Sequence, residues 1–376
     1  MAKTLQEHYD YLSDSVKLAR YRSAMEQLVQ PGHVVLDLGC GSGLLGLMAF
    51  RAGAGKVIFV EEDPIIEVAR RTMAEAGFAD QSEFLQRNSF ELELPEKVDL
   101  VVCDHIGYFG FDYGVLALLA DAKQRFLKPD GVIVPAEIEL QLAPIESETC
   151  RNLVGRWRDG SVADEFSWVG STSANTKHSA KLSETALLAD AAPLITFDLG
   201  EPAEPFLTWN AEFRCARDGM LDGVAGWFDC RLADDIHMTN SPAAAKSLER
   251  PQAFLPLESP VPVSAGDRVN ATVMARHLDN VIGWIIELPE SGQRFALTTF
   301  NGLLLDKQAL TRAQPDRVAQ LNDRGRARQI VMSYCDGQRT LAEVQALVHE
   351  KHPDLFPSAQ ATSSFVEQVL AWDTGA

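Results

Sequence analysis

The sequence has no run of basic residues, and bases are scarce overall. Its 34 Lys and Arg face 53 Asp and Glu, which gives a formal net charge of −19 at pH 7. A protein of this charge repels polyanions such as DNA and RNA, so we expect no nucleic-acid partner. Basic peptides and other cationic substrates are compatible with it.

Long apolar runs and paired cysteines are also missing. No stretch approaches the ~18 apolar residues of a membrane helix, and the first residues lack a signal-peptide core. We therefore expect a cytoplasmic protein without a membrane partner. The six cysteines are scattered without a Cys-x-x-Cys pair, which is typical of reduced thiols. His349 and His352 have no third ligand nearby, so we predict no metal site.

What is present is a glycine-rich segment that follows a predicted strand. The strand is the apolar run Val34–Leu38. Gly39, Gly41 and Gly43 come next, and without a Cβ they let the backbone turn sharply and approach a ligand. The apolar residues that follow, 44–52, predict a helix.

The spacing of these glycines discriminates between nucleotide cofactors. A dinucleotide fingerprint has glycines at its first, third and sixth positions, whereas here they occupy the first, third and fifth. No Gly-Lys-Ser/Thr follows, so the segment is not a phosphate-binding P-loop. A second predicted strand, 57–60, carries Glu61 at its carboxyl end, where a carboxylate can bind a ribose diol. The pattern indicates a nucleoside without a pyrophosphate. It resembles motif I of the class I S-adenosylmethionine-dependent methyltransferases, which implies S-adenosylmethionine as the cofactor.

Two further strands are predicted over 83–87 and 98–103. Polar side chains lie at the carboxyl ends of the four successive strands, at Asp37, Glu61, Asn88 with Ser89, and Asp104. Ligands bind at this edge of open parallel sheets, so we expect these side chains to surround one site. A helix over 113–126 and a fifth strand over 132–135 continue the alternation. The fold class predicted for residues 1–135 is therefore α/β, with N-terminal helices and a Rossmann-like doubly wound sheet.

The sequence pattern changes after residue 135. Short runs alternate apolar and polar residues with period two and are separated by Pro, Gly and Asp, which predicts a β-barrel or sandwich over 136–300. The last section, 316–376, has the pattern of a small helical domain. We therefore predict three domains.

Several motifs resemble the protein arginine methyltransferase family. They are Asp14-Ser-Val-Lys17-x3-Tyr21-Arg, Val-Leu-Asp37-Leu-Gly-Cys-Gly-Ser-Gly, Glu93-Leu-Pro-Glu-Lys-Val-Asp99, Asp104-His-Ile-Gly-Tyr-Phe, Leu-Lys-Pro-Asp-Gly131-Val-Ile-Val-Pro135, and Gly223-x2-Gly-Trp-Phe-Asp229 before Asn240-Ser-Pro242. The resemblance implies a Rossmann-like cofactor domain joined to a β-barrel. It also implies a dimerisation arm, here at 150–190, and hence a homodimer.

The chain departs from this family at the acceptor site. The family holds the acceptor guanidinium with a hairpin that carries two glutamates nine residues apart, and here those positions are Asp104 and Tyr113, with Asp112 beside the latter. The family's Thr-His-Trp loop is also replaced, and Lys17 stands where the family has an arginine. One carboxylate pairs with one edge of a planar guanidinium, so two are needed to hold both edges and keep it poised. We therefore do not expect efficient methylation of arginine in generic basic proteins.

The candidate site residues form two groups. The acceptor is expected to be held or deprotonated by Asp104, His105, Asp112 and Tyr113. The cofactor is expected to be held by Lys17, Asp37, Gly39, Gly41, Gly43, Glu61, Asn88 and Ser89. An amine acceptor must be neutral to attack, so a carboxylate or imidazole within hydrogen-bond reach is useful.

The tail carries a second resemblance. The identity of the methyl acceptor stays undetermined, and three hypotheses follow. Residues 335–347 are similar to the winged-helix peptide-binding domain of pyrroloquinoline quinone biosynthesis, which implies the docking of a leader peptide. One hypothesis is a peptide or protein N-methyltransferase with the tail as docking module. A second is a small-molecule methyltransferase of secondary metabolism. A third is a non-catalytic protein that senses the cofactor.

Overall fold

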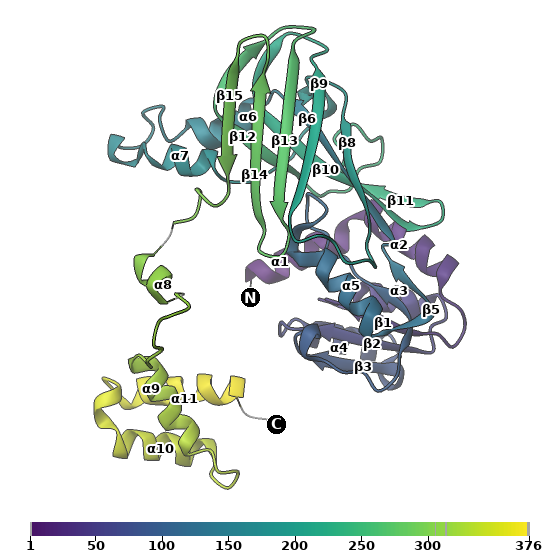
Figure 1. Cartoon of the computed structure of the whole chain (residues 1–376). Coiled ribbons are helices and arrows are strands. Elements are labelled where there is room, and N and C mark those ends of the chain that lie inside the picture. Colours follow the sequence, from purple (N-terminus) through teal and green to yellow (C-terminus); the bar gives the residue numbers. More distant parts are fainter. Residues whose placement is uncertain (1, 305, 313, 374–376) are drawn as a thin grey trace. The chain divides into compact units, whose positions relative to one another are not determined.

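The computed structural model describes residues 2–304, 306–312 and 314–373. The chain forms two compact units, residues 1–303 and 304–376 (Figure 1). The first unit contains a parallel sheet followed by a large antiparallel-sheet domain, and the second contains helices. This architecture confirms the predicted fold class, whereas the three-domain division of the chain stays a prediction.

The parallel sheet has five strands in the order β3-β2-β1-β4-β5. Their bounds are β1 (Val34–Leu38), β2 (Lys56–Glu61), β3 (Ser82–Gln86), β4 (Val98–Val102) and β5 (Leu127–Val134). The helices between them are α3 (Leu44–Arg51), α4 (Ile66–Glu75) and α5 (Val115–Arg125). The strands run outward from β1 to β3 on one side and from β4 to β5 on the other, so the strand order reverses between β1 and β4. Open α/β sheets bind ligands at such a switch point.

Two local predictions in this domain differ from the structure. The helix predicted over 113–126 begins only at Val115, because Tyr113 and Gly114 have left-handed φ angles of 58° and 71°. The fifth strand begins earlier than predicted, at Leu127, because that residue already pairs with Val98 of β4.

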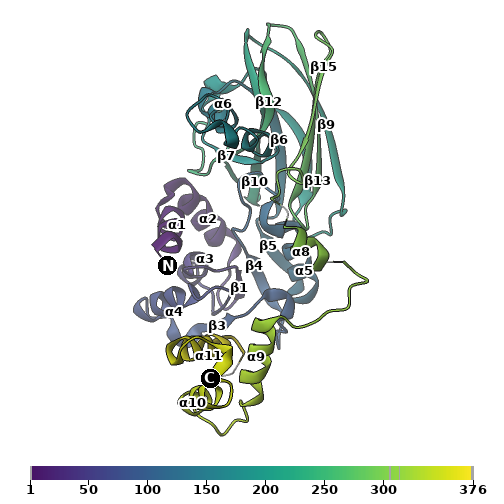
Figure 2. The same ribbon diagram turned by 90° about the vertical axis from the view of Figure 1, so that its left-hand side faces the viewer.

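Two helices precede the parallel sheet. They are α1 (Ala2–Ser13) and α2 (Ser15–Leu28), and the side chain of Asp14 caps α2 by accepting a hydrogen bond from the Lys17 backbone N–H. Helix α2 contacts α3 and the strands β10 and β11, so it lies between the parallel sheet and the antiparallel domain (Figure 2). This position lets the N-terminal segment reach residues of both.

The antiparallel domain consists of two sheets. The first has the order β7-β12-β10-β6-β8 with β11 on β10, and the second has the order β15-β14-β13-β9. Their bounds are β6 (Glu137–Ile145), β7 (His178–Ala180), β8 (Ala192–Asp198), β9 (Leu207–Arg214), β10 (Gly219–Ala233), β11 (Ile236–Thr239), β12 (Gln252–Val263), β13 (Arg268–Arg276), β14 (Val281–Leu288) and β15 (Gln293–Thr298). Strands of the two sheets approach each other at β8–β9, β6–β9 and β12–β15, as in a barrel. The buried Trp284 belongs to the main core, whereas the buried Trp227 belongs to a smaller cluster that includes Cys150 of helix α6 (Glu148–Gly155).

The segment predicted as an arm contains α6 (Glu148–Gly155), the short 3₁₀ turn η4 (Asp164–Phe166) and α7 (Val169–Ala174). Both α6 and α7 pack on β12, and the part between them stands away from the sheet (Figure 1). Three apolar side chains of this part, Val162, Phe166 and Trp168, are exposed.

The C-terminal unit has its own small core. Its helices are α8 (Lys307–Arg312), α9 (Asp323–Ser333), α10 (Leu341–Lys351) and α11 (Ala359–Asp373). The core residues are Ala327, Val331, Val344, Val348, Phe365, Val366 and Val369. Thr340 is the N-cap of α10 and forms a capping box with Glu343. No strand occurs among the described residues of this unit, so its likeness to a winged-helix peptide-binding domain stays a prediction.

Candidate active site

The glycine loop after β1 has the geometry of a ligand cradle. Gly39, Gly41 and Gly43 have φ angles of 68°, 51° and 80°, a region that L-residues with side chains rarely adopt. A Cβ on Gly41 would lie 2.7 Å from Cε1 of His8, which belongs to α1. The loop therefore requires glycine for its conformation and, at Gly41, for its close contact with α1.

Two carboxylates hold this loop in place. Glu61 accepts a hydrogen bond from the Gly41 N–H through Oε2 at 2.9 Å and one from the Asp63 N–H through Oε1 at 3.0 Å. Asp37 accepts one from the Gly46 N–H at 2.8 Å in the first turns of α3. Asp37 is fully buried behind the loop, and burial raises its pKa to about 7. Glu61 instead lines a cavity.

This cavity of about 620 Å³ is the candidate cofactor pocket. It brings together six of the predicted site residues, which are Gly39, Glu61, Asn88, Ser89, His105 and Tyr113. Asn88 accepts from the Phe90 N–H and donates to Glu62, so both ends of its amide are engaged. Carboxylate and amide groups beside a glycine cradle fit the ribose and amino-acid parts of S-adenosylmethionine. When bound, that cofactor supplies an activated methyl group on a sulfonium.

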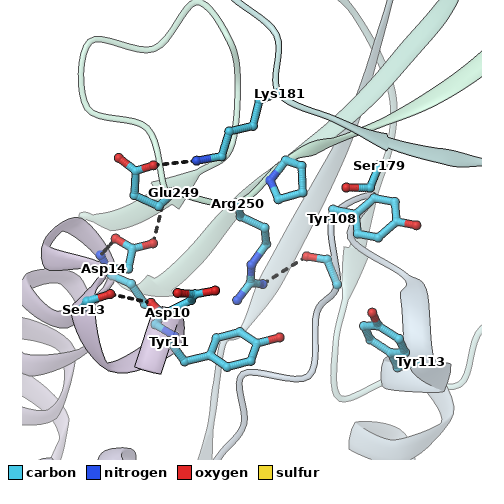
Figure 3. A pocket seen from close by; sticks show the side chains of 13 residues that line it. Asp10, Tyr11, Ser13, Asp14, Tyr108, Tyr113, Ser179, Lys181, Glu249 and Arg250 are labelled. Atoms are coloured by element: carbon cyan, nitrogen blue, oxygen red, sulfur yellow. Dashed lines mark hydrogen bonds and ion pairs between the residues drawn. The ribbon is translucent and has the colours of Figure 1, made fainter. Parts of the chain in front are cut away.

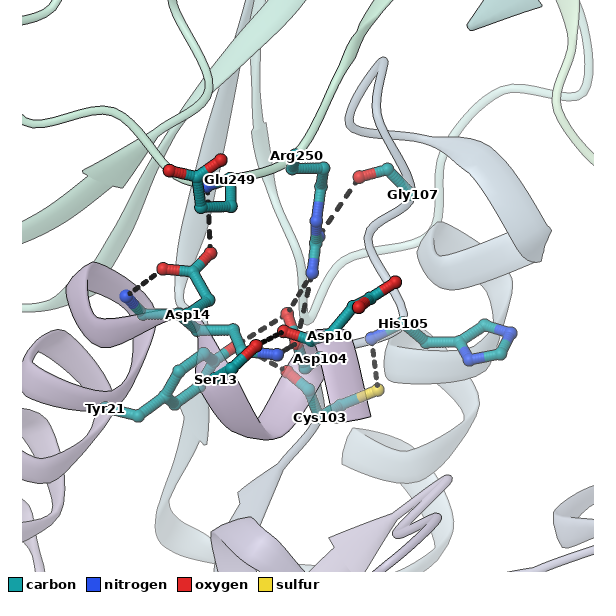
Figure 4. A network of polar contacts seen from close by, with 11 residues as sticks. Asp10, Ser13, Asp14, Tyr21, Cys103, Asp104, His105, Gly107, Glu249 and Arg250 are labelled. Carbon is teal, nitrogen blue, oxygen red and sulfur yellow. Dashed lines mark hydrogen bonds and ion pairs between the residues drawn. The ribbon is translucent and has the colours of Figure 1, made fainter. Parts of the chain in front are cut away.

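Asp104 lies at the centre of a buried polar network (Figure 4). Lys17 donates to its Oδ2 at 3.1 Å, and Nη2 of Arg250 lies 3.1 Å from both carboxylate oxygens. The Tyr21 hydroxyl lies 3.4 Å from its Oδ1. Burial alone would raise the pKa of Asp104, but the charges of Arg250 and Lys17 outweigh it, so the pKa lies below its ordinary value. The carboxylate is therefore ionised at neutral pH.

A second cavity of about 690 Å³ opens on this network (Figure 3). Its walls include Tyr11 of α1, Lys17, Tyr108, Tyr113 and Arg250. Tyr113 lines both this cavity and the cofactor pocket. It therefore stands where a methyl donor and an acceptor would meet, and the cavity is the candidate acceptor pocket.

Asp112 and His105 have different surroundings from those of Asp104. The Asp112 carboxylate is buried, accepts hydrogen bonds from the N–H groups of Tyr108 and Phe109, and pairs with Lys177. It closes the 107–112 turn. The His105 ring points away from Asp104 (Figure 4). His105 lines the cofactor pocket and makes an edge contact with Tyr113. Burial lowers the pKa of His105, so the imidazole is neutral at pH 7.

The structure separates some residues that the sequence groups together. Lys17, predicted to bind the cofactor, lies on the acceptor side with Asp104, and Asp37 lies behind the loop. Arg250, Phe90 and Leu278 line the two pockets although sequence reasoning did not single them out. The only sequence signal for Arg250 is the place of its segment, where the Thr-His-Trp loop is replaced. The cofactor and acceptor roles of all these residues stay predictions.

Comparisons with known proteins identify relatives of this chain. The family model described as Ribosomal protein L11 methyltransferase (PrmA) matches residues 22–155. Arginine N(omega)-methyltransferase of Streptomyces achromogenes subsp. streptozoticus is 30% identical over 271 residues, covering 69% of this chain and 73% of that protein. Protein arginine N-methyltransferase PRMT10 of Arabidopsis thaliana is 27% identical over 316 residues, covering 73% of this chain and 82% of that protein.

A solved structure supports the fold. The Trypanosoma brucei PRMT1 enzyme-prozyme heterotetrameric complex with AdoHcy superposes with a TM-score of 0.70 at 23% sequence identity, covering 77% of this chain and 96% of that chain. The antiparallel domain is thus arranged as in a solved arginine methyltransferase. The identity over most of the Streptomyces protein's length shows that the chain belongs to the arginine N-methyltransferase family of S-adenosylmethionine-dependent methyltransferases.

Proposed function

We propose that this protein transfers the methyl group of S-adenosylmethionine to a basic nitrogen of a peptide or protein, with the guanidinium of arginine as the first candidate acceptor. The names of the Streptomyces and Arabidopsis relatives support arginine. They weigh against our expectation from the altered hairpin that arginine is a poor substrate. The trypanosome complex contains AdoHcy, which supports S-adenosylmethionine as the methyl donor.

The observation that carries the proposal is that the acceptor pocket already holds a guanidinium. Nη2 of Arg250 pairs with both oxygens of Asp104, and Nη1 donates to the Gly107 carbonyl at 3.0 Å. An ionised carboxylate beside a backbone carbonyl has the acceptor geometry that a planar cation requires. In this proposal an acceptor arginine enters from the pocket and competes with Arg250 for Asp104.

The chain's own residues then align the reactants. Asp104, which pairs with the pocket residues Lys17 and Arg250, fixes the plane of the acceptor. Tyr113, which lines both pockets, lies at the point of transfer. In-line displacement at a sulfonium depends mainly on such positioning. The acceptor nitrogen gains a methyl group and loses a proton as the sulfonium becomes a thioether. The neutral imidazole of His105 is the candidate proton acceptor.

A primary amine is the second candidate acceptor. It is favoured because both acids of the hairpin segment already form ion pairs within the protein. Asp104 already holds Lys17 and Arg250, and Asp112 already holds Lys177. A guanidinium is best held by two carboxylates, whereas a neutral amine needs only one hydrogen-bond acceptor to orient it. The departures from the family hairpin therefore fit an amine better than they fit arginine.

One panel of substrates distinguishes these acceptors. We would use a peptide that carries Arg, Lys or citrulline at one fixed position, together with free arginine, and follow methyl transfer by mass spectrometry. Methylation of the Arg peptide alone supports the first candidate, and methylation of the Lys peptide alone supports the second. Free arginine with an equal or higher kcat/KM would support a small-molecule function. Transfer to none of them, by a folded protein that binds the cofactor, would contradict the proposal.

Assembly and docking belong to the same proposal. We propose that two copies associate through 150–190, because Phe166 and Trp168 of this segment are more than half exposed. The heterotetrameric state of the trypanosome relative supports an oligomer. We also propose that the C-terminal unit docks part of the acceptor.

Among the residues that the structure describes, none of the helices has the length and apolar content that crossing a membrane requires.

A further inference from the structure

The turn between β13 and β14 belongs to the antiparallel domain but lines the cofactor pocket. Leu278, Asp279 and Asn280 of this turn share the pocket with Glu61 and the glycine loop. Figure 1 shows the turn at the end of the antiparallel sheet that faces the parallel-sheet domain. The cofactor pocket is therefore bounded by both parts of the first unit.

The turn is built to present one apolar side chain. Arg276 and Val281 are paired across the hairpin, and Arg276 forms an ion pair of 2.6 Å with Asp279 inside the turn. His277 is buried, and Asn280 takes the left-handed φ of 57° that closes the turn. Leu278 remains at the tip with 65% of its surface exposed. Because this side chain lines the pocket, a bound ligand with an apolar face can cover it and gain from the burial.

A second exposed apolar side chain lines the same pocket. Phe90 follows β3 directly after Asn88 and Ser89 and is 55% exposed. Leu118 of α5 adds a half-buried apolar surface. The lining of the pocket therefore combines these apolar side chains with the polar groups of Glu62, Asn88 and Ser89. A heteroaromatic base has matching features, because its faces are apolar and its edge forms hydrogen bonds.

We propose that Leu278 and Phe90 close on the adenine base of the cofactor, so that the antiparallel domain completes the cofactor site. Glu61 lies at the end of β2, and β3 is its neighbour in the sheet. A base attached to a ribose at Glu61 then falls beside the residues that follow β3. Leu278 covers this position from the other domain and excludes water from the face of the base.

Binding measurements test this without any methyl acceptor. We would measure the affinity of Leu278→Ala for S-adenosylhomocysteine and for 5′-methylthioadenosine, which keeps the base and ribose but lacks the amino acid, by calorimetry. Loss of the leucine contact should weaken both ligands by the same factor, about 5- to 30-fold. Leu278→Met, which keeps an apolar side chain, should bind both nearly as the wild type does. Phe90→Ala should weaken both ligands in the same way.

The matched control is Phe300→Ala, which removes an exposed aromatic side chain of the same domain outside this pocket. It should leave both affinities unchanged. Affinities of Leu278→Ala within twofold of the wild type would overturn the proposal. So would a loss confined to S-adenosylhomocysteine, because it would place Leu278 at the amino-acid end. Failure of the wild type to bind either ligand would instead contradict the cofactor assignment itself.

Discussion

Asp104 joins three parts of the molecule through two buried cations. Lys17 comes from α2, and Arg250 comes from the segment directly before β12. Both cations are at most 10% exposed, so their charges are poorly screened by water. The carboxylate that would face the acceptor is therefore also the counter-ion that allows these cations to be buried.

Replacing Asp104 by Asn should destabilise the fold. The variant leaves Lys17 and Arg250 buried without a counter-ion, and removing one partner of such a network costs about 3–5 kcal/mol. Urea unfolding at pH 7 measures this cost. The matched control is Glu83→Gln, which breaks a partly exposed pair with Lys56 and should cost less than about 1 kcal/mol. Equal effects of the two variants would contradict a structural role for the Asp104 network.

The same carboxylate has a predictable pH dependence. Its folded-state pKa is lowered, so its stabilisation is fully present above the unfolded value of about 3.9 and is lost as the pH falls through the folded pKa. The wild type should therefore lose stability faster than Asp104→Asn as the pH is lowered below about 4.

Asp37 has the opposite behaviour, because burial raises its pKa to about 7. Between about pH 4 and pH 7 the folded state keeps a proton that the unfolded state has released. Stability should therefore fall as the pH rises through this window in the wild type. Asp37→Asn carries no such proton, so its melting temperature should depend less on pH there. Parallel melting curves of the two proteins from pH 4 to pH 8 would contradict the raised pKa.

Glu61 should determine the affinity for the cofactor. Its carboxylate lines the pocket and also fixes the glycine loop through the Gly41 N–H. Losing a charged hydrogen bond to the ribose costs about 1.5–3 kcal/mol, or roughly 10- to 150-fold in affinity. Calorimetry of Glu61→Ala with S-adenosylhomocysteine measures it, with exposed Glu75→Ala of α4 as control. An unchanged affinity would remove this carboxylate from the site.

The predictability of single residues depends on how local their contacts are. The glycine loop and Glu61 are separated by about twenty residues and by one strand–helix–strand unit, so their spacing carries the prediction. Arg250 is 146 residues from Asp104 in the chain, and the contact exists only because the antiparallel domain folds back on the parallel sheet. No periodicity indicates such a pair. The same holds for Leu278, whose exposure is visible only in three dimensions.

At the scale of elements, segments with a regular pattern of apolar residues were predicted correctly as strands, and segments with a mixed pattern were not predicted in detail. Buried parallel strands such as β1 and β4 follow from continuous apolar runs, and the alternation in β6 and β9 follows from one buried face. The start of α5 was wrong because the left-handed φ of Tyr113 is held by tertiary structure and is unusual for an aromatic residue. The segment over 150–190 carries no clear period, and its helices α6 and α7 depend on packing against β12.

This same segment should control the oligomeric state. Phe166 and Trp168 are 54% and 56% exposed, and both belong to the segment between α6 and α7. If they pack against a second copy, Phe166→Ser combined with Trp168→Ser should convert a dimer into a folded monomer. Light scattering coupled to gel filtration measures the mass, with Phe300→Ser as control. A wild type that is monomeric at micromolar concentration would contradict the proposed dimer.

At the scale of the whole molecule, the candidate pockets and the C-terminal helices belong to different folded units. Residues 1–303 contain both candidate pockets, and the C-terminal unit has a core of its own. The helical content of the tail was predicted from its sequence, because its pattern of residues is a local signal, and the structure shows Thr340 as the N-cap of α10. What the tail binds was not predictable in the same way, since a docking surface depends on a partner.

Removing the C-terminal unit should change the choice of substrate more than the chemistry. If the unit docks a remote part of the acceptor, tethering raises the local acceptor concentration, often to the millimolar range. A chain ending at residue 303 should then bind a full-length peptide substrate more weakly and still methylate a short acceptor fragment supplied at high concentration. Circular dichroism and melting must first show that this chain is folded. A purely structural tail would lower stability and affect all acceptors equally. A folded 1–303 chain that methylates long and short acceptors in the same ratio as the intact protein would exclude docking.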